Sequence, residues 1–193
     1  MLLRDVLATE LLTYRGVAPR RDVSTVLAPF ERLTNAPELA VWDAVSAQAL
    51  RLCHAQSAGV SIFADPRYHE LTWVSACGEL AEYKSRRFPQ RHSLCGVVFE
   101  SRAAQLFVEP HRYFQWIAQA GVTIDEGLVV PLVSGERMYG TLWAMTHEPV
   151  HSFDAADEAT LIMLGEAATE YLARHRPNSA ADAIAHADGF TRP

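Results

Sequence analysis

Three cysteines are all that this chain of 193 residues contains, which excludes a scaffold held together by disulfide bonds. No run of about 18 apolar residues occurs, and this absence argues against a membrane-spanning helix. Basic side chains are outnumbered, because 17 Lys and Arg stand against 23 Asp and Glu and give a net charge of −6. Proteins that bind phosphate backbones are usually basic, so we expect no nucleic-acid partner.

The first residues lack a secretory signal, because Arg4 and Asp5 interrupt the apolar start and no small-residue cleavage site is evident. With no signal and no membrane segment, we expect a cytoplasmic protein that does not bind membranes. Apolar residues are plentiful, since 49% of the chain is hydrophobic and 21% is charged. This composition suffices for one ordinary domain with a buried core plus additional segments.

Hydrophobic spacing divides the chain into three parts. An apolar stripe with helical spacing runs through residues 1–14, and we interpret residues 1–35 as an N-terminal helical arm. Residues 36–175 have the alternation of helix and strand patterns typical of a folded domain. Residues 176–193 are rich in Ala and Asp, and we expect a flexible tail there.

Within residues 36–175, the pattern predicts helices at both ends and strands between them. Helices are predicted over 38–53, 79–83, 97–102, 111–118 and 154–174, and strands over 57–64, 70–76, 105–108, 127–133 and 138–146. The turn residues between the first two strands and between the last two predict two hairpins. Pro131 lies inside a strand and predicts a bulge there. The order indicates an α+β fold, with an antiparallel sheet covered by the terminal helices.

Three segments in this order resemble a GAF domain. The first, AGVSIFADPRYHELTWVSACG, resembles the family's first hairpin, and RHSLCGVVFESRAAQLFVEP resembles the region that follows it. The most specific is EGLVVPLVSGERMYGTLWAMTHEPVHSFDAADEATLIMLGEAATEYLA, which resembles the family's last hairpin and last helix. The resemblance implies a six-stranded antiparallel sheet. Its first and last helices would pack on one face, and loops and short helices would cover a small-molecule pocket on the other.

GAF domains are typically sensory or regulatory modules and are often homodimers. The resemblance therefore implies a module that senses a small molecule and acts through homodimerisation or a separate signalling partner. An alternative is a dimerisation or interaction module without a ligand, in which residues 1–14 and 154–174 form the dimer surface. The cofactor is left open.

The candidate ligand-binding residues lie in segments that would cover the sheet. They combine aromatic side chains with a few polar groups, as small-ligand pockets usually do. The candidates are Phe88, Arg91, His92, Cys95, Phe107, Arg112, Tyr113, Trp116 and Glu126. Four cations fall between Lys84 and Arg91, so a charged ligand is expected to be an anion.

Cys95 is the residue best placed for chemistry. It lies at the N-terminal end of the helical stretch predicted over 97–102 and follows Arg91 and His92, and both features favour the thiolate. The sequence Leu94-Cys95-Gly96 also resembles a cysteine motif of free methionine sulfoxide reductases, which implies a thiol-dependent reductase as an alternative function. That branch needs further cysteines before Glu126, and residues 111–126 contain none. Whether the protein is an enzyme is left open, and a non-catalytic module is favoured.

The sequence contains partial patterns for three other cofactors, namely zinc, bilin and haem. Residues 147–151, HEPVH, match the letters of the zinc-protease motif, but Pro149 would break the helix that this motif needs, so no metal site is expected. A covalent bilin is not expected, because the Cys-His pair of such relatives occurs only at Cys53-His54, away from the pocket. Haem is a further alternative, and it would need an axial ligand from His92, His111 or Cys95.

Overall fold

The structure is a computed structural model that describes residues 36–65, 70–135 and 137–175. The predictions of an N-terminal arm and a C-terminal tail fall outside these residues. The helices are α4 (Glu38–Leu52), α5 (Leu94–Ser101), α6 (Gln115–Gln119) and α7 (Ala155–His175), with 3₁₀ turns η2 (Ala81–Tyr83) and η3 (Pro110–Arg112). The strands are β1 (Ser57–Asp65), β2 (Glu70–Gly78), β3 (Arg87–Pro89), β4 (Gln105–Val108), β5 (Glu126–Ser134) and β6 (Arg137–Thr146).

The six strands form one antiparallel sheet in the order β3-β2-β1-β6-β5-β4, which confirms the predicted fold class. Both predicted hairpins are present, and they meet where β1 pairs with β6 and Gly59 lies opposite Trp143. A side chain at Gly59 would overlap the Trp143 ring and the Ser75 carbonyl, so this crossing requires glycine. The two hairpins therefore pack closely against each other at the centre of the sheet.

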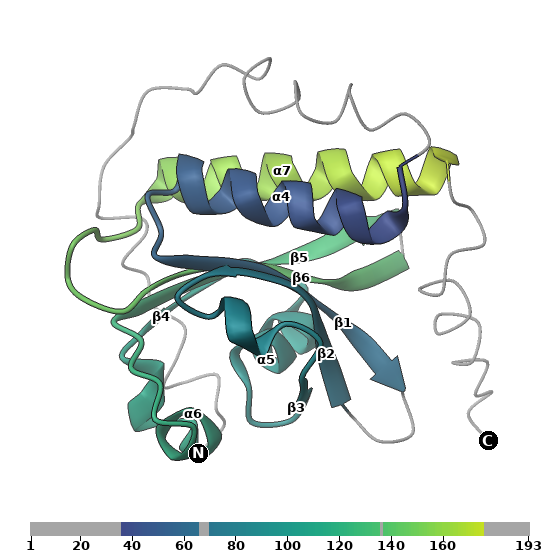
Figure 1. Ribbon diagram of the computed structural model, residues 1–193. Helices are drawn as coiled ribbons and strands as arrows, with labels where there is room; N and C mark the ends of the chain where they lie inside the picture. The colour runs from purple at the N-terminus through teal and green to yellow at the C-terminus, as the bar shows by residue number, and fades with distance from the viewer. Residues whose placement is uncertain (1–35, 66–69, 136, 176–193) are drawn as a thin grey trace.

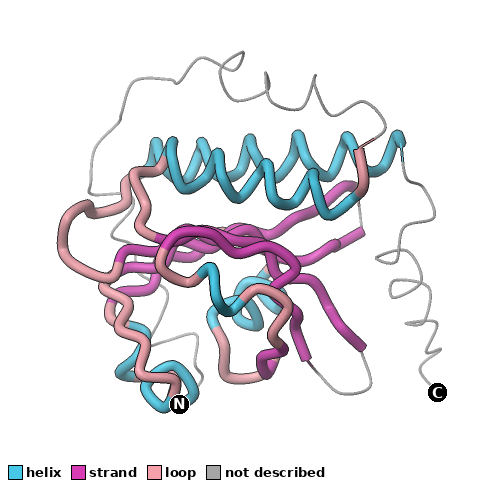
Figure 2. The backbone as a smooth tube through the Cα atoms, in the orientation of Figure 1, coloured by secondary structure: helices cyan, strands magenta, loops and turns pink. Residues whose placement is uncertain are grey.

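Helices α4 and α7 lie side by side on one face of the sheet, and α5 and α6 lie on the other (Figures 1 and 2). The two faces follow from strand alternation. On β6, Leu142 and Ala144 pack toward the helices, whereas Trp143 and Met145 pack toward α5 and α6. The sheet thus separates two hydrophobic cores. The second core lies between the sheet and helices α5 and α6 and includes Trp73, Phe107 and Trp143, and the candidate site belongs to it.

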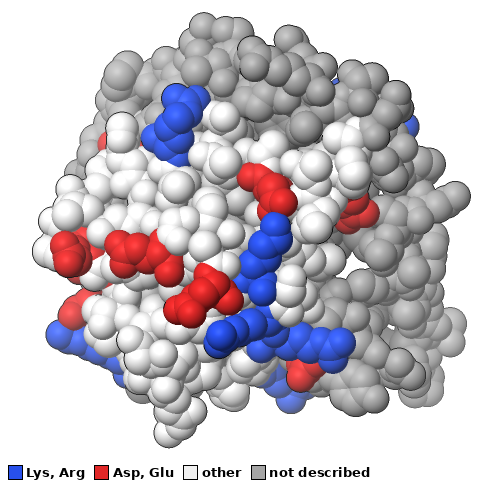
Figure 3. All heavy atoms as spheres, in the orientation of Figure 1, with Lys and Arg blue, Asp and Glu red and all other residues white. Residues whose placement is uncertain are grey.

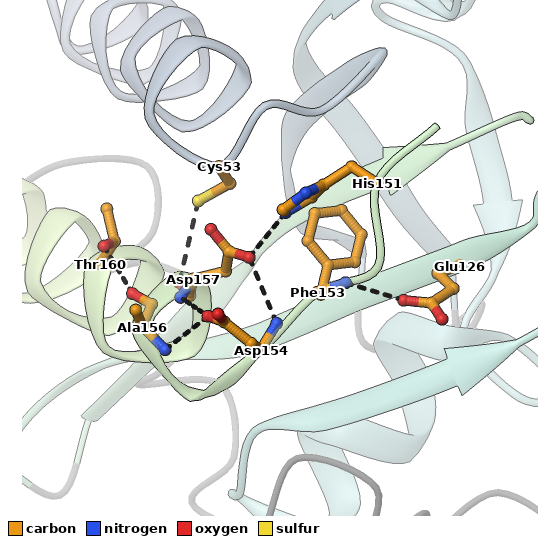
Figure 4. A network of polar contacts seen from close by, with 8 residues as sticks. All are labelled: Cys53, Glu126, His151, Phe153, Asp154, Ala156, Asp157 and Thr160. Atoms are coloured by element: carbon orange, nitrogen blue, oxygen red, sulfur yellow. Dashed lines mark hydrogen bonds and ion pairs between the residues drawn. The ribbon is translucent and has the colours of Figure 1, made fainter. Parts of the chain in front are cut away.

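The start of α7 is fixed by a reciprocal cap (Figure 4). Asp154 Oδ1 accepts hydrogen bonds from the N–H groups of Ala156 (2.8 Å) and Asp157 (3.0 Å). Asp157 Oδ2 in turn accepts from the Asp154 N–H at 3.2 Å and lies 2.8 Å from His151 Nε2. This arrangement is a capping box, and it satisfies amide groups that the first turn of a helix leaves unpaired.

The structure differs from the sequence predictions at four points. Strand β3 was not predicted, and α5 begins at Leu94, three residues before the predicted start. The helix predicted over 111–118 is divided into η3 and α6. Pro131 pairs with Thr141 without a bulge at that residue, and the register shift lies between Leu132 and Val133. Proline is tolerated there because β4 pairs with β5 only as far as Val129, so β5 has a single neighbour at Pro131.

In the part of the chain that the structure describes, no helix is both long and apolar enough to cross a membrane.

Candidate ligand-binding site

A small, partly open cavity lies in the second core, between the sheet and the elements that cover it. Its volume is about 10 Å³, which is room for about one water molecule. Strands β2 and β6, the edge strand β3 and helices α5 and α6 all contribute to its walls. The lining residues are Leu71, Trp73, Phe88, Ser93, Leu94, Cys95, Trp116, Ile117 and Met145.

Four aromatic rings form the centre of this core. The Trp73 ring lies 4.2 Å from that of Phe88 and 4.6 Å from that of Trp143, measured between centroids. Trp116 closes the cluster from α6, with its centroid 5.0 Å from Phe88 and 6.5 Å from Trp73. Tilted and edge-on contacts at these distances add attraction beyond the burial of apolar area. The rings therefore fill the space in which a ligand would lie.

Trp116 is the covering residue that is held least firmly. It belongs to a helix of five residues and is only half-buried, and its Nε1–H donates a hydrogen bond to the His92 carbonyl at 3.1 Å. Trp73 and Trp143, in contrast, stand on central strands of the sheet and are buried. Among these three tryptophans, Trp116 is therefore the one with the most exposed side chain.

The position of Cys95 is fixed by the start of α5. Ser93 caps this helix, because its Oγ accepts the Gly96 N–H at 3.1 Å and its own hydroxyl donates to the Gln90 carbonyl at 2.8 Å. Gly96 lies directly against the Gln90 carbonyl, where a side chain would overlap it. This close contact holds the first turn of α5 against the loop that follows β3. Cys95, in that turn, is 4% exposed.

A polar group of side chains lies under α5. Cys95 Sγ is 3.3 Å from Ser61 Oγ, and Ser61 Oγ also accepts a hydrogen bond from Trp143 Nε1–H at 3.1 Å. Burial, the largest effect, raises the pKa of the Cys95 thiol, while the nearby hydroxyls of Ser61 and Thr141 lower it. The result opposes the thiolate expected from the helix N-terminus, because the buried thiol has lost its hydration.

Three of the predicted site residues line the cavity together, namely Phe88, Cys95 and Trp116. His92 contributes its backbone carbonyl to Trp116, while its side chain is exposed. Phe107 is buried in the same core, 6.3 Å from Phe114 between ring centroids, but it does not line the cavity.

The other predicted residues do not reach the cavity. Arg91 and Tyr113 are exposed, the latter by 52%, and Arg112 forms a salt bridge with Glu109 at 2.6 Å. Glu126 is buried, but its Oε2 accepts a hydrogen bond from the Phe153 N–H at 2.9 Å, in the loop before α7 (Figure 4). Glu126 therefore supports the helix layer rather than the cavity.

Several lining residues were not singled out from the sequence, among them Leu71, Trp73, Ile117 and Met145. The available signal was strand parity, since alternate residues of one strand share a face. Trp73 and Met145 fall on the face opposite the terminal helices by that rule.

The cations near the site are largely matched by acids. Lys84 Nζ lies 2.7 Å from Asp43 Oδ1, and Arg87 lies 3.5 Å from Glu70. Arg86 lies over the Tyr83 ring at 4.7 Å. On the face shown in Figure 3, acidic and basic side chains are interspersed, with uncharged areas between them. This pairing weakens the expectation of an anionic ligand, and the apolar walls favour a neutral one.

The histidines of the region take part in structural hydrogen bonds. His147 Nδ1 lies 2.7 Å from the Thr123 carbonyl, which can only accept, so Nδ1 carries a hydrogen, and Nε2 lies 2.7 Å from the Ser57 hydroxyl. The HEPVH segment is not helical. His111 Nδ1 lies 2.9 Å from the Ile124 carbonyl. Among the described residues, no group of His, Cys, Asp and Glu is arranged to hold a metal ion.

The family profile of the GAF domain matches residues 36–173, which is most of the chain, so the protein belongs to the GAF domain family. Comparison with curated protein sequences gives no match.

Solved structures of the same fold include domains of different function. One is the second GAF domain of DevS from Mycobacterium smegmatis, with a TM-score of 0.61 at 23% identity, covering 74% of this chain and 100% of that one. A second is the phycocyanobilin-bound GAF domain of a cyanobacterial phytochrome, with a TM-score of 0.66 at 11% identity, covering 84% and 100%. A third is free methionine-R-sulfoxide reductase from Neisseria meningitidis, with a TM-score of 0.64 at 20% identity, covering 85% and 98%. At these identities the likeness shows the fold alone.

Proposed function

We propose that this protein is a regulatory GAF module that senses a small, neutral, mainly aromatic molecule in the cavity beside Cys95. The observation that carries the proposal is the construction of the second core. The sheet forms its floor, and its cover includes α5 and the five-residue helix α6, with the three-residue edge strand β3 beside them. Apolar walls with few polar groups are typical of ligand pockets.

Binding requires the cover to move, because a cavity of about 10 Å³ cannot hold an organic molecule. Pockets for such molecules measure about 300 Å³ or more. Trp116 is the residue to be displaced, because it is half-buried and makes one hydrogen bond to a loop carbonyl. The ligand would then replace the Trp116 ring against Trp73 and Phe88, and α6 would move outward.

A chain of hydrogen bonds offers a route from α6 to the helix layer. The segment after α6 is tied to the end of β6 through the Thr123 carbonyl and His147. Gln56 Oε1 accepts the N–H groups of His147 and Glu148, where the loop toward α7 begins. Movement of α6 would pull on this loop and on the capped start of α7. We propose that the signal leaves through α4 and α7, to a second copy of the chain or to a separate partner protein.

Native mass spectrometry and an absorbance spectrum of freshly purified full-length protein test the ligand proposal. We expect a retained small molecule, or stabilisation against heat by neutral one- and two-ring aromatic compounds. Trp116→Ala should change the affinity for such compounds, whereas Tyr113→Ala should not, because Tyr113 is exposed and away from the cavity. Absence of any retained molecule and of any stabilisation would contradict the proposal.

The homodimer is tested separately by sedimentation. Ala47 on α4 and Ala159 on α7 are exposed small residues on helices of the outer layer, a surface suited to helix pairing. If the dimer forms there, Ala47→Arg should yield a monomer with unchanged thermal stability. A dimer that survives this substitution would place the contact elsewhere.

The alternative of a free methionine sulfoxide reductase rests on Cys95. Cys53 and Cys77 pack against the core on the helix side of the sheet, whereas Cys95 belongs to the opposite core. A resolving thiol must reach the reacting sulfur, and the sheet separates these cysteines. Turnover of free methionine-R-sulfoxide with a thiol reductant, lost in Cys95→Ser, would establish the alternative. Lack of turnover by the wild-type protein would exclude it.

A further inference from the structure

The Trp116 side chain connects the cavity with the loop that precedes α5. Its ring contributes to the cavity wall, with its centroid 5.0 Å from that of Phe88 and edge-on to Trp73 at 6.5 Å. Its Nε1–H donates to the backbone carbonyl of His92 at 3.1 Å. Because Trp116 is only half-buried, its ring is held by this hydrogen bond and by ring contacts rather than by enclosure.

The acceptor of this hydrogen bond is held in place by its neighbours in the chain. His92 has a φ of +61°, in the left-handed region that residues other than glycine rarely adopt. Ser93 fixes the chain on both sides, since its hydroxyl donates to the Gln90 carbonyl at 2.8 Å and its own carbonyl accepts the Val97 N–H at 3.1 Å. The loop itself therefore directs the His92 carbonyl toward Trp116. Unusual backbone conformations that the surrounding structure maintains are often found at ligand-binding sites.

These features define what a molecule needs in order to take the place of the Trp116 ring. A flat two-ring aromatic molecule would recover the contacts with Phe88 and Trp73. A carbonyl oxygen can only accept a hydrogen bond, so the molecule must also carry a donor where Nε1–H lies. A molecule without that donor would cover the His92 carbonyl and leave it without a partner, which is unfavourable. The mostly apolar lining of the cavity disfavours a charged molecule.

We infer that the ligands of this cavity are neutral indole-type aromatics with a ring N–H, and that Trp116 is an internal ligand that such a molecule displaces. This assignment of the ligand class rests on the proposed binding of an aromatic molecule in this cavity. The Trp116 ring and the ligand compete for the same ring contacts and the same carbonyl. The apparent affinity is therefore reduced in proportion to the fraction of molecules in which the Trp116 ring has left the site. The His92 carbonyl determines specificity, because it distinguishes a ring N–H from a ring oxygen.

The test compares indole with benzofuran, which has the same two fused rings but an oxygen in place of the N–H. Titration of the full-length wild-type protein, followed by NMR of the tryptophan N–H signals, gives a dissociation constant for each compound. We expect indole to bind roughly fivefold more tightly than benzofuran, the effect of one hydrogen bond of ordinary strength. Equal affinities would overturn this inference and leave the proposed binding of aromatic molecules in place. Binding of neither compound would overturn both.

The carbonyl carbon of His92 reports on its hydrogen bond independently of affinity. In protein labelled with ¹³C and ¹⁵N, its signal is observed through the N–H of Ser93. We expect this signal to stay close to its free-protein position when indole is bound, since one N–H donor replaces another, and to move upfield when benzofuran is bound. Similar shifts with both compounds would overturn the role of this carbonyl.

Trp116→Phe tests the competition, because it keeps an aromatic cover and removes the donor to His92. We expect this variant to bind indole roughly fivefold more tightly than the wild type does. Tyr113→Phe is the matched control, since Tyr113 is exposed and lies outside the cavity lining, and it should bind indole as the wild type does. An affinity in Trp116→Phe no higher than in the wild type would overturn the role of Trp116 as an internal ligand.

His92→Gly separates the backbone carbonyl from the imidazole. Glycine keeps the carbonyl and tolerates the positive φ, so the variant should preserve the preference for indole over benzofuran. Loss of the preference would overturn the assignment of the carbonyl as the acceptor. The comparison of the two compounds in the wild-type protein decides the ligand class even if a variant does not fold.

Discussion

Truncation of Trp116 is the sharpest way to open the cavity. Replacing a fully buried Trp by Ala costs about 3–5 kcal/mol in unfolding free energy. Trp116 is half-buried, and its hydrogen bond to His92 is exposed to solvent, so about half of that cost applies. We expect Trp116→Ala to lower the unfolding free energy by about 2 kcal/mol.

Urea unfolding followed by circular dichroism measures this loss. With a slope of about 2 kcal/mol per M, the midpoint should fall by about 1 M at an unchanged slope. The same variant removes the cover above Cys95, so the folded protein should react about tenfold faster with a thiol-specific reagent. Mapping of the modified residue assigns this rise to Cys95 rather than to Cys77, which is already partly exposed.

Tyr113→Ala is the matched control, because Tyr113 is also aromatic and lies two residues from the start of α6, but is exposed. It should change the unfolding free energy by less than about 0.5 kcal/mol and leave the reaction of Cys95 as in wild type. A folded Trp116→Ala protein in which Cys95 remains as protected as before would refute the assignment of Trp116 as the cover.

Three further predictions concern the elements around the site. Asp154→Ala should lower the unfolding free energy by about 1 kcal/mol, seen in thermal or urea unfolding, because α7 loses its N-cap. Gly96→Ala should displace α5 from the Gln90 carbonyl and lower the unfolding free energy by more than about 2 kcal/mol in the same unfolding assay. A loss of only about 0.3 kcal/mol would show that the backbone adjusts easily to a side chain at this position. The raised pKa of Cys95 means that the folded state favours the neutral thiol, so the contribution of this group to stability should be constant below about pH 8 and fall at higher pH, where unfolded thiols ionise. Cys95→Ser should flatten that alkaline fall, and an unchanged pH profile would contradict the burial argument.

The periodic elements of this fold were predictable from the sequence. The apolar alternation of β5 and β6 and the apolar side of α7 depend on local spacing, which determines which face a residue occupies. Strand β3 was not predicted because its sequence has no strand signature. It has only three residues, one of them Pro89, and it follows a polar stretch. It becomes a strand by pairing with β2, where Phe88 lies opposite Leu71.

The candidate site was only partly predictable. Phe88 and Trp116 were found because aromatic residues stood out in the covering segments. Glu126 was assigned to the pocket by its position in the chain, yet strand parity places it with Leu128 and Val130 on the helix face. The grouping of Ser61, Thr141 and Cys95 could not be read from sequence, because it depends on the pairing of β1 with β6 and on the descent of α5.

The central claim, that a small neutral aromatic molecule binds in the second core, is tested most directly by NMR of the four tryptophan side chains. Trp73, Trp116 and Trp143 belong to the proposed ligand-binding core, whereas Trp42 lies in the helix-side core, where its Nε1–H donates to Glu38. In ¹⁵N-labelled protein titrated with unlabelled indole, we predict saturable shifts of the indole N–H signals of the first three and an unmoved signal from Trp42. No shift at millimolar indole, or equal shifts of all four signals, would contradict the account.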